Sequence, residues 1–212
     1  MTVTAKKNTL RERRHAATAE AMLEAAEHVM VAQGYELTTM QDIAREAGCA
    51  AGTFYLYFKN KQELFEALLV RHLQAIYAAS EAKMALVTDP LEKIHQSMVS
   101  AVQYCQEHVG FLQVALTAMP LRHQAMHERL AGMGYSQPQQ FRRMTEGYLR
   151  QAQKQGRVRR DIPVDVLYHF IDAAIFSFME TVSAAPGRPN AQKQADILWE
   201  LITGGLQGKE AS

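Results

Sequence analysis

The sequence predicts an all-α fold, and two observations carry that prediction. Apolar residues recur every three or four positions along most of the 212 residues, whereas no stretch alternates polar and apolar residues for long. Residues that favour helix ends or first helical turns punctuate this pattern: they are Gly34, Gly48, Gly156, Pro90 and Pro163. Together these signals predict about nine helices and no sheet.

The composition narrows the class of protein. Hydrophobic residues make up 48% of the chain and charged residues 21%, which is typical of a folded globular protein. No apolar run approaches the roughly 20 residues that cross a bilayer, and none follows the basic N-terminus, so we expect neither a membrane span nor a signal peptide. Cys49 and Cys105 lack the spacing of a disulfide or zinc framework, which favours a reducing, cytoplasmic location.

The N-terminal third contains four predicted helices. An apolar stripe at residues 22–30 predicts a first helix that ends at a glycine. Thr38, with Gln41 three residues later, has the spacing of a capping box and opens a second helix. A short third helix at about residues 51–58 and a long fourth helix follow. Two short helices joined by a glycine-containing turn, behind a longer helix, form the layout of a helix-turn-helix.

The detailed sequence of this region is more specific than its layout. The segments AAEHVMVAQGY at 25–35, TTMQDIAREAG at 38–48 and GTFYLYFKNKQEL at 52–64 resemble the DNA-binding domain of the TetR family of transcriptional regulators. The resemblance covers about residues 19–70, a quarter of the chain. It implies a repressor that binds a palindromic operator in double-stranded DNA as a homodimer and that a small apolar or amphipathic ligand releases.

The third helix divides its residues between an inner and an outer face. On a helical wheel Phe54 and Phe58 fall on the side that packs against the first two helices, whereas Leu56 falls on the opposite side. Tyrosine hydroxyls and a lysine at the start of the fourth helix suit phosphate oxygens. The predicted DNA contacts are Thr39, Met40, Ala51, Gly52, Thr53, Tyr55, Tyr57 and Lys61.

Two alanines depart from the family pattern. Ala50 stands where the family commonly has a serine, so the third helix begins without a side-chain cap. Ala51 stands where a longer polar or basic residue is frequent. Base reading therefore rests on Thr53, Met40 and the shape of the groove.

The resemblance also implies a division into parts. We expect a basic, partly disordered arm at residues 1–17, a DNA-binding domain at 18–64, and a ligand-binding and dimerisation domain at 65–208. In its first 15 residues the chain has five Lys or Arg against one Glu. Such an arm can reach phosphates or a minor groove, although a solvated tail has the same composition.

The later helices carry less specific signals. Broad apolar faces on predicted helices at 163–184 and 190–207 favour a dimer surface, although a buried helix would have a similar pattern. A ligand pocket would lie among the helices between residues 61 and 184. Its candidate lining residues, each of which alone is more typical of an ordinary core, are Met98, Tyr104, Phe111, Met119, Met144 and Phe176.

The sequence favours no enzyme and no cofactor. His123 and His127 have the spacing of metal ligands on one helical face, but the neighbouring Arg122 and Arg129 disfavour a cation, so we expect no metal. No nucleophile elbow, phosphate-binding loop or dinucleotide fingerprint is present. Besides a ligand-responsive repressor, a DNA-binding architectural or division-control protein of the same fold, without an inducer, fits the sequence.

Overall fold

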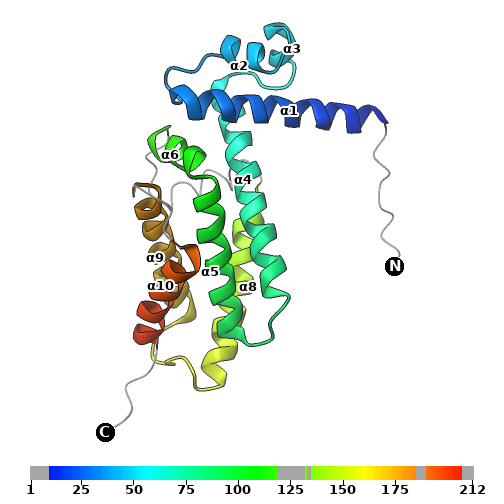
Figure 1. Cartoon of the computed structure of the whole chain (residues 1–212). Coiled ribbons are helices and arrows are strands. Elements are labelled where there is room, and N and C mark those ends of the chain that lie inside the picture. The colour runs from blue at the N-terminus through cyan, green and yellow to red at the C-terminus, as the bar shows by residue number, and fades with distance from the viewer. Residues whose placement is uncertain (1–9, 119–131, 133–134, 185–189, 207–212) are drawn as a thin grey trace. The chain divides into compact units, whose positions relative to one another are not determined.

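The computed structural model describes residues 10–118, 132, 135–184 and 190–206. Over these residues it contains nine α-helices and no strand, which confirms the predicted fold class (Figure 1). The helices are α1 Leu10–Gln33, α2 Met40–Glu46, α3 Ala51–Tyr55, α4 Lys61–Met84, α5 Pro90–Glu107, α6 Val109–Ala118, α8 Gln137–Lys154, α9 Val164–Ala184 and α10 Ala191–Leu206. None of them is long and apolar enough to cross a membrane.

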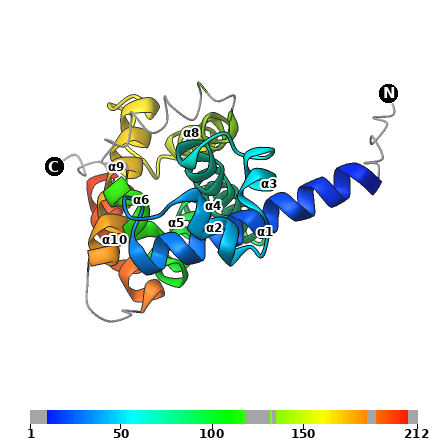
Figure 2. The ribbon, with the colours of Figure 1, turned by 90° about the horizontal axis from the view of Figure 1, so that it is seen from above.

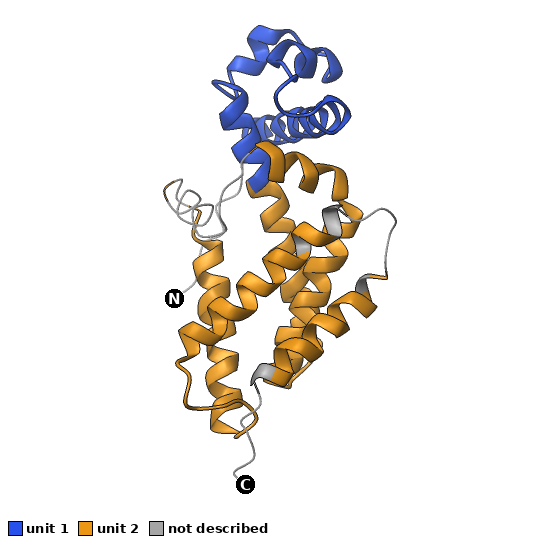
Figure 3. Ribbon diagram, turned by 90° about the vertical axis from the view of Figure 1, so that its left-hand side faces the viewer, with its two compact units in different colours: residues 1–69 blue, residues 70–212 orange. Residues whose placement is uncertain are grey.

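The chain folds as two compact units, residues 1–69 and residues 70–212 (Figure 3). The division falls inside α4, five residues beyond the boundary expected from the sequence. Unit 1 also contains more helix than expected, because α1 begins at Leu10, inside the segment expected as an arm. Leu, Arg, Glu and Ala, which favour helices, dominate this segment, and the Thr18 hydroxyl donates to the Arg14 carbonyl.

Unit 1 packs α1, α2, α3 and the first two turns of α4 around one small core. The α1 helix ends at Gly34, whose φ of 84° lies in the left-handed region that favours glycine. Its amide donates to the Met30 carbonyl at 2.8 Å and closes the last turn. The fully buried large side chains of this core are Met22, Met30, Ile43, Phe54, Leu64, Phe65 and Leu68.

The second helix begins one residue later than expected. Its N-cap is Thr39, which accepts from the Asp42 amide, while the Asp42 carboxylate accepts from the Thr39 amide and completes the capping box. The predicted Thr38–Gln41 box is therefore wrong. Thr38 is buried instead, and its hydroxyl donates to the Gly34 carbonyl at 2.6 Å, which ties the loop to the end of α1.

Unit 2 is a helical bundle with α5 at its centre. Within it, α5 lies between α9 and α10 on one side and α8 on the other, as Figures 1 and 2 show. Asp89 caps α5 by accepting from the Leu91 and Glu92 amides, and Pro90 follows at the first helical position, as the sequence predicts. The core unites α5, α8, α9 and α10; its fully buried members include Met98, Val102, Leu149, Ala152 and Ala195.

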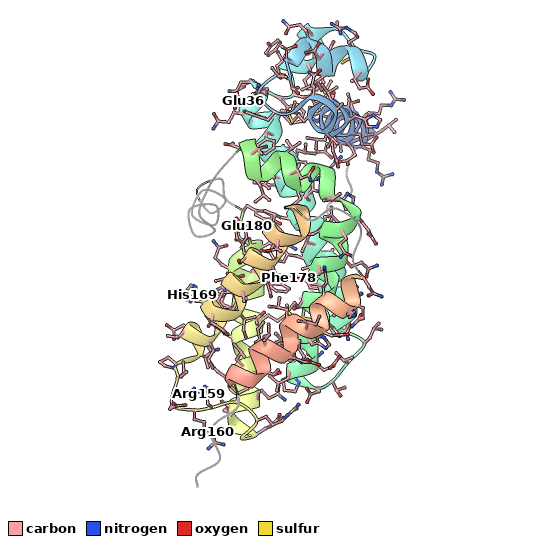
Figure 4. The ribbon with its side chains drawn as sticks, turned by 60° about the vertical axis from the view of Figure 1, so that its left-hand side comes forward. Glu36, Arg159, Arg160, His169, Phe178 and Glu180 are labelled. Carbon is pink, nitrogen blue, oxygen red and sulfur yellow. The ribbon has the colours of Figure 1, made fainter. Side chains whose placement is uncertain are left out.

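The connection from α8 to α9 turns sharply at Gly156, whose φ is 75°. Arg160, labelled in Figure 4, donates to the Gln153 and Lys154 carbonyls at the end of α8. Arg159 pairs with Asp161 in the same loop. The guanidinium of Arg160 thus satisfies carbonyls that the helix end would otherwise leave unpaired.

Candidate nucleic-acid interface

Two buried rings hold α3 in place. Phe54 is fully buried and Phe58 nearly so, with their ring centroids 6.0 Å apart. The helix itself spans only five residues, and its N-cap, Ala50, makes no side-chain hydrogen bond. The burial of the two rings and the missing side-chain cap agree with the predictions, but the helix ends at Tyr55 instead of near Phe58. Packing, not capping, therefore fixes its position.

The opposite side of α3 is exposed. Gly52 and Thr53 lie in solvent, Tyr55 is 49% exposed and Leu56 is 80% exposed. A Cβ atom added at Gly52 would meet nothing within 4 Å, so the fold itself does not require glycine at this position. Ala51 is half-buried at the start of the helix. The surface thus combines small, hydroxyl and apolar groups, which suit the base edges and methyl groups of a DNA groove.

Tyr57 lies at the edge of this surface and has a partner that the sequence did not predict. Its ring stacks on that of His15 from α1, with centroids 4.4 Å apart and planes 27° apart. Tyr57 is half-buried, whereas His15 is exposed. The one available signal was that His15 shares a helical face with Ala19, Met22 and Ala26.

Lys61 makes contacts inside unit 1. Its ammonium donates to the Tyr35 carbonyl at 2.7 Å and to the Glu36 carbonyl at 3.1 Å, and lies 4.4 Å from the centroid of the Tyr35 ring. The Tyr35 ring in turn packs on Phe65. Lys61 therefore ties the start of α4 to the loop after α1, and a phosphate contact would have to share or replace these bonds.

The two predicted contacts near the start of α2 differ in exposure. Thr39 is exposed, but its hydroxyl serves the helix by donating to the Asp42 carboxylate at 2.6 Å. That hydrogen bond holds the pKa of the Asp42 carboxyl below its usual value. Met40 is only 6% exposed and packs in the core of unit 1, which argues against a direct contact with DNA. We therefore leave Met40 out of the candidate interface.

Two of the residues suggested for a ligand pocket, Tyr104 and Phe111, contact the same side chain, His72. Met98 belongs to the core between α5 and its neighbours. Phe111 stacks on His72 with centroids 3.8 Å apart, and a 2.9 Å hydrogen bond joins the Tyr104 hydroxyl to His72 Nδ1. Met144 and Phe176 are half-buried on α8 and α9. Five residues named from the sequence lie outside the part of the chain that the structure describes: Met119, Arg122, His123, His127 and Arg129.

Unit 2 also contains a cluster of polar side chains that the sequence did not predict. Burial, reinforced by the charge of Asp172, raises the pKa values of the Tyr77 and Tyr168 hydroxyls. The Arg142 guanidinium lies 5.3 Å from the Tyr168 ring centroid and pairs with Glu146 at 2.7 Å. These residues come from α4, α8 and α9, so no spacing within one helix could have shown that they meet.

Comparison with known proteins supports the resemblance. Residues 22–68 match the family described as bacterial regulatory proteins, tetR family. The chain is 26% identical over 186 residues to the transcriptional repressor KstR2 of Mycobacterium tuberculosis, covering 87% of this chain and 90% of that protein. It is also 26% identical over 192 residues to the probable acrEF/envCD operon repressor of Escherichia coli, covering 87% and 84% of the two chains.

A solved structure shows the same fold. The repressor NalD of Pseudomonas aeruginosa superposes with a TM-score of 0.71 over 93% of this chain and 99% of that chain, at 20% identity. The matched family consists of regulators and not of enzymes, which agrees with the prediction that the chain is not an enzyme. The chain is a member of the TetR family of helix-turn-helix transcriptional regulators, homologous over most of its length to known repressors.

Proposed function

We propose that this regulator represses transcription as a homodimer on a palindromic operator, from which a small apolar or amphipathic ligand releases it. The observation that carries the proposal is the exposed face of α3, where Gly52, Thr53, Tyr55 and Leu56 turn away from the core. A helix seated in this way on a small helical domain can enter a major groove. In a dimer, two such helices would reach successive grooves about 34–36 Å apart.

Thr53 is the proposed base-reading side chain. Its hydroxyl can donate to or accept from a base edge, and its methyl group can contact a thymine methyl. Gly52 allows the backbone of α3 to approach the DNA. Tyr55 and Tyr57 would bond phosphates, and Thr39 and Ala51 would lie at the margin of the contact.

The dimer surface is proposed to lie on α9 and α10, which pack against each other in unit 2. Val166 and Phe170, one turn apart on α9, are 51% and 54% exposed. Ile197 and Leu201, one turn apart on α10, are 49% and 71% exposed. In Figure 4 the half-buried Phe178 marks the part of α9 that packs on the core. A second copy would cover these four apolar side chains, whose exposure in a monomer is unfavourable.

The ligand is proposed to bind in unit 2 and to be apolar with a polar end. The Phe111 ring beside His72 offers an aromatic surface, and the Tyr104, Tyr77 and Tyr168 hydroxyls offer hydrogen bonds in a mostly apolar interior. A ligand that favours a conformer with a different spacing of the two recognition helices would lower operator affinity. The coupling typically amounts to 5- to 150-fold in affinity.

Enrichment of duplexes from a random library by the immobilised protein tests operator binding. We expect a short sequence with two inverted half-sites, and Thr53→Ala should relax the preference at one position of each half-site. Enrichment of unrelated sequences throughout would contradict the proposal and favour an architectural protein.

Sedimentation equilibrium tests the dimer surface. Phe170→Glu should produce monomers, whereas Leu86→Glu should remain dimeric, because Leu86 is also strongly exposed (84%) but lies outside α9 and α10.

A library of small apolar acids, alcohols and steroids, titrated against the protein–operator complex, tests the proposed ligand binding. If no compound weakened the complex, regulation by an inducer would be excluded for those classes.

A further inference from the structure

The N-terminal turns of α1 run past the recognition helix of unit 1. Figures 1 and 2 show these dark-blue turns continuing beyond α3. The stack of His15 on Tyr57, with centroids 4.4 Å apart, joins the two helices at this point. Tyr57 lies at the edge of the proposed DNA surface, so the side chains one turn before His15 extend that surface.

The helical wheel separates the three arginines of this segment. Arg11 precedes His15 by four residues and therefore lies on the same face, one turn further toward the N-terminus. Arg13 precedes it by two residues and lies about 160° away, on the opposite face. Arg14 lies between these two faces. All three are exposed.

The charge of this segment has little compensation inside the protein. Among the residues that the structure describes, neither Arg11 nor Arg13 takes part in a hydrogen bond or ion pair through its side chain. One acidic residue, Glu12, accompanies the three arginines in the first turns of α1. This excess of positive charge would attract an anionic partner, and the phosphates of DNA bound next to α3 would be such a partner.

We propose that the first turns of α1 form a second phosphate-binding element, in which Arg11 contacts the DNA backbone beside the recognition helix and His15 positions it through Tyr57. The assignment rests on the proposed operator binding. It makes the start of α1 part of the interface, where the sequence alone offered a solvated tail as an equal alternative. Because phosphates carry no sequence information, Arg11 adds affinity and not specificity.

Arg11→Ala tests the assignment, with Arg13→Ala as the matched control. Both changes remove one exposed arginine from the same helix, so nonspecific effects of net charge are equal in the two variants. The probes are the duplex enriched from the random library and a scrambled duplex of the same length. On the slope of about 0.9 per phosphate contact, Arg11→Ala should weaken binding about eightfold per lost contact at 0.1 M salt, on both duplexes. Arg13→Ala should have a much smaller effect.

The salt dependence provides a second reading. In a dimer, Arg11→Ala should lower the slope of log K against log salt by about 1.8, and Arg11→Lys should restore most of it. Equal effects of Arg11→Ala and Arg13→Ala, with helix content unchanged by circular dichroism, would overturn the assignment and leave operator binding intact. Failure of the wild-type protein to enrich any duplex would instead overturn the proposed function, and the assignment with it.

Discussion

The two short helices of the DNA-binding unit are stabilised in different ways. The α2 helix begins with a complete capping box, in which Thr39 and Asp42 satisfy each other's backbone amides. The α3 helix has no side-chain cap and depends on the burial of Phe54 and Phe58. A helix held only by packing on one side leaves its other side and its first amides available to a ligand. Local hydrogen bonds therefore secure α2, whereas the buried rings on its inner side secure the recognition helix, α3.

Removal of a buried ring behind α3 should have the largest effect on stability. Phe54→Ala deletes a fully buried ring and should lower the free energy of unfolding of unit 1 by about 3–5 kcal/mol. Denaturant unfolding measures the change, and operator binding should be lost with it. Leu56→Ala, at an 80% exposed position of the same helical segment, should change stability by no more than about 0.5 kcal/mol. Similar losses of stability for both variants would contradict the conclusion that packing on its inner side holds α3 in place.

Removal of the cap should cost less. Thr39→Ala deletes the hydroxyl that accepts from the Asp42 amide and should lower the free energy of unfolding by about 0.5–2 kcal/mol. Thr53→Ala, which deletes an exposed hydroxyl on α3, serves as the control and should leave stability within about 0.5 kcal/mol of wild type. If Thr53→Ala were the more destabilising change, α3 would depend on local hydrogen bonds after all.

Adding a side-chain cap to α3 should stabilise unit 1, because this helix lacks one. Ala50→Ser places a hydroxyl at the N-cap, where the backbone is already extended, and should stabilise unit 1 by about 0.5–1 kcal/mol. Ala17→Ser, at an exposed position in the interior of α1, should instead destabilise slightly, because serine has a lower helix propensity than alanine. Thermal unfolding of the two variants should therefore shift in opposite directions.

Acid should affect the capped helix first. The pKa of Asp42 is lowered in the folded protein, chiefly by the hydrogen bond from the Thr39 hydroxyl. The ionised carboxylate therefore stabilises the fold at pH values above its usual pKa of 3.8, and this stabilisation is lost as the pH falls through the pKa of the folded state. The stability difference between wild type and Asp42→Asn should be constant near pH 7 and shrink in acid below about pH 4. The corresponding difference for Phe54→Leu should not follow this titration. Parallel pH profiles for the two variants would refute this assignment.

Local signals explain which elements the sequence could predict. Gly34, Gly156 and the Asp89-Pro90 pair end or begin helices through their own backbone preferences, so their positions were readable without tertiary information. The start of α2 was missed by one residue, because Thr38 and Thr39 are both competent caps. Only the bond from Thr38 to the Gly34 carbonyl decides between them.

The candidate interface was less predictable where tertiary contacts redirect side chains. Lys61 bonds carbonyls more than 20 residues away in sequence, which no spacing reveals. Met40 shares an apolar helical stripe with Ile43 and Ala44, which indicates burial, whereas the family resemblance implies a contact with DNA. The periodicity indicated burial correctly. The stack of His15 on Tyr57 joins segments whose approach depends on the whole fold of unit 1.

The open space around Gly52 has a consequence for the evolution of this regulator. A side chain added there would meet no atom of the protein within 4 Å, and the neighbouring Leu56 is almost as unconstrained at 80% exposure. Mutations at these two positions can therefore be retained or discarded according to their effect on DNA alone. A duplicated copy of the gene could acquire a new operator in single steps without first compensating for a weakened fold.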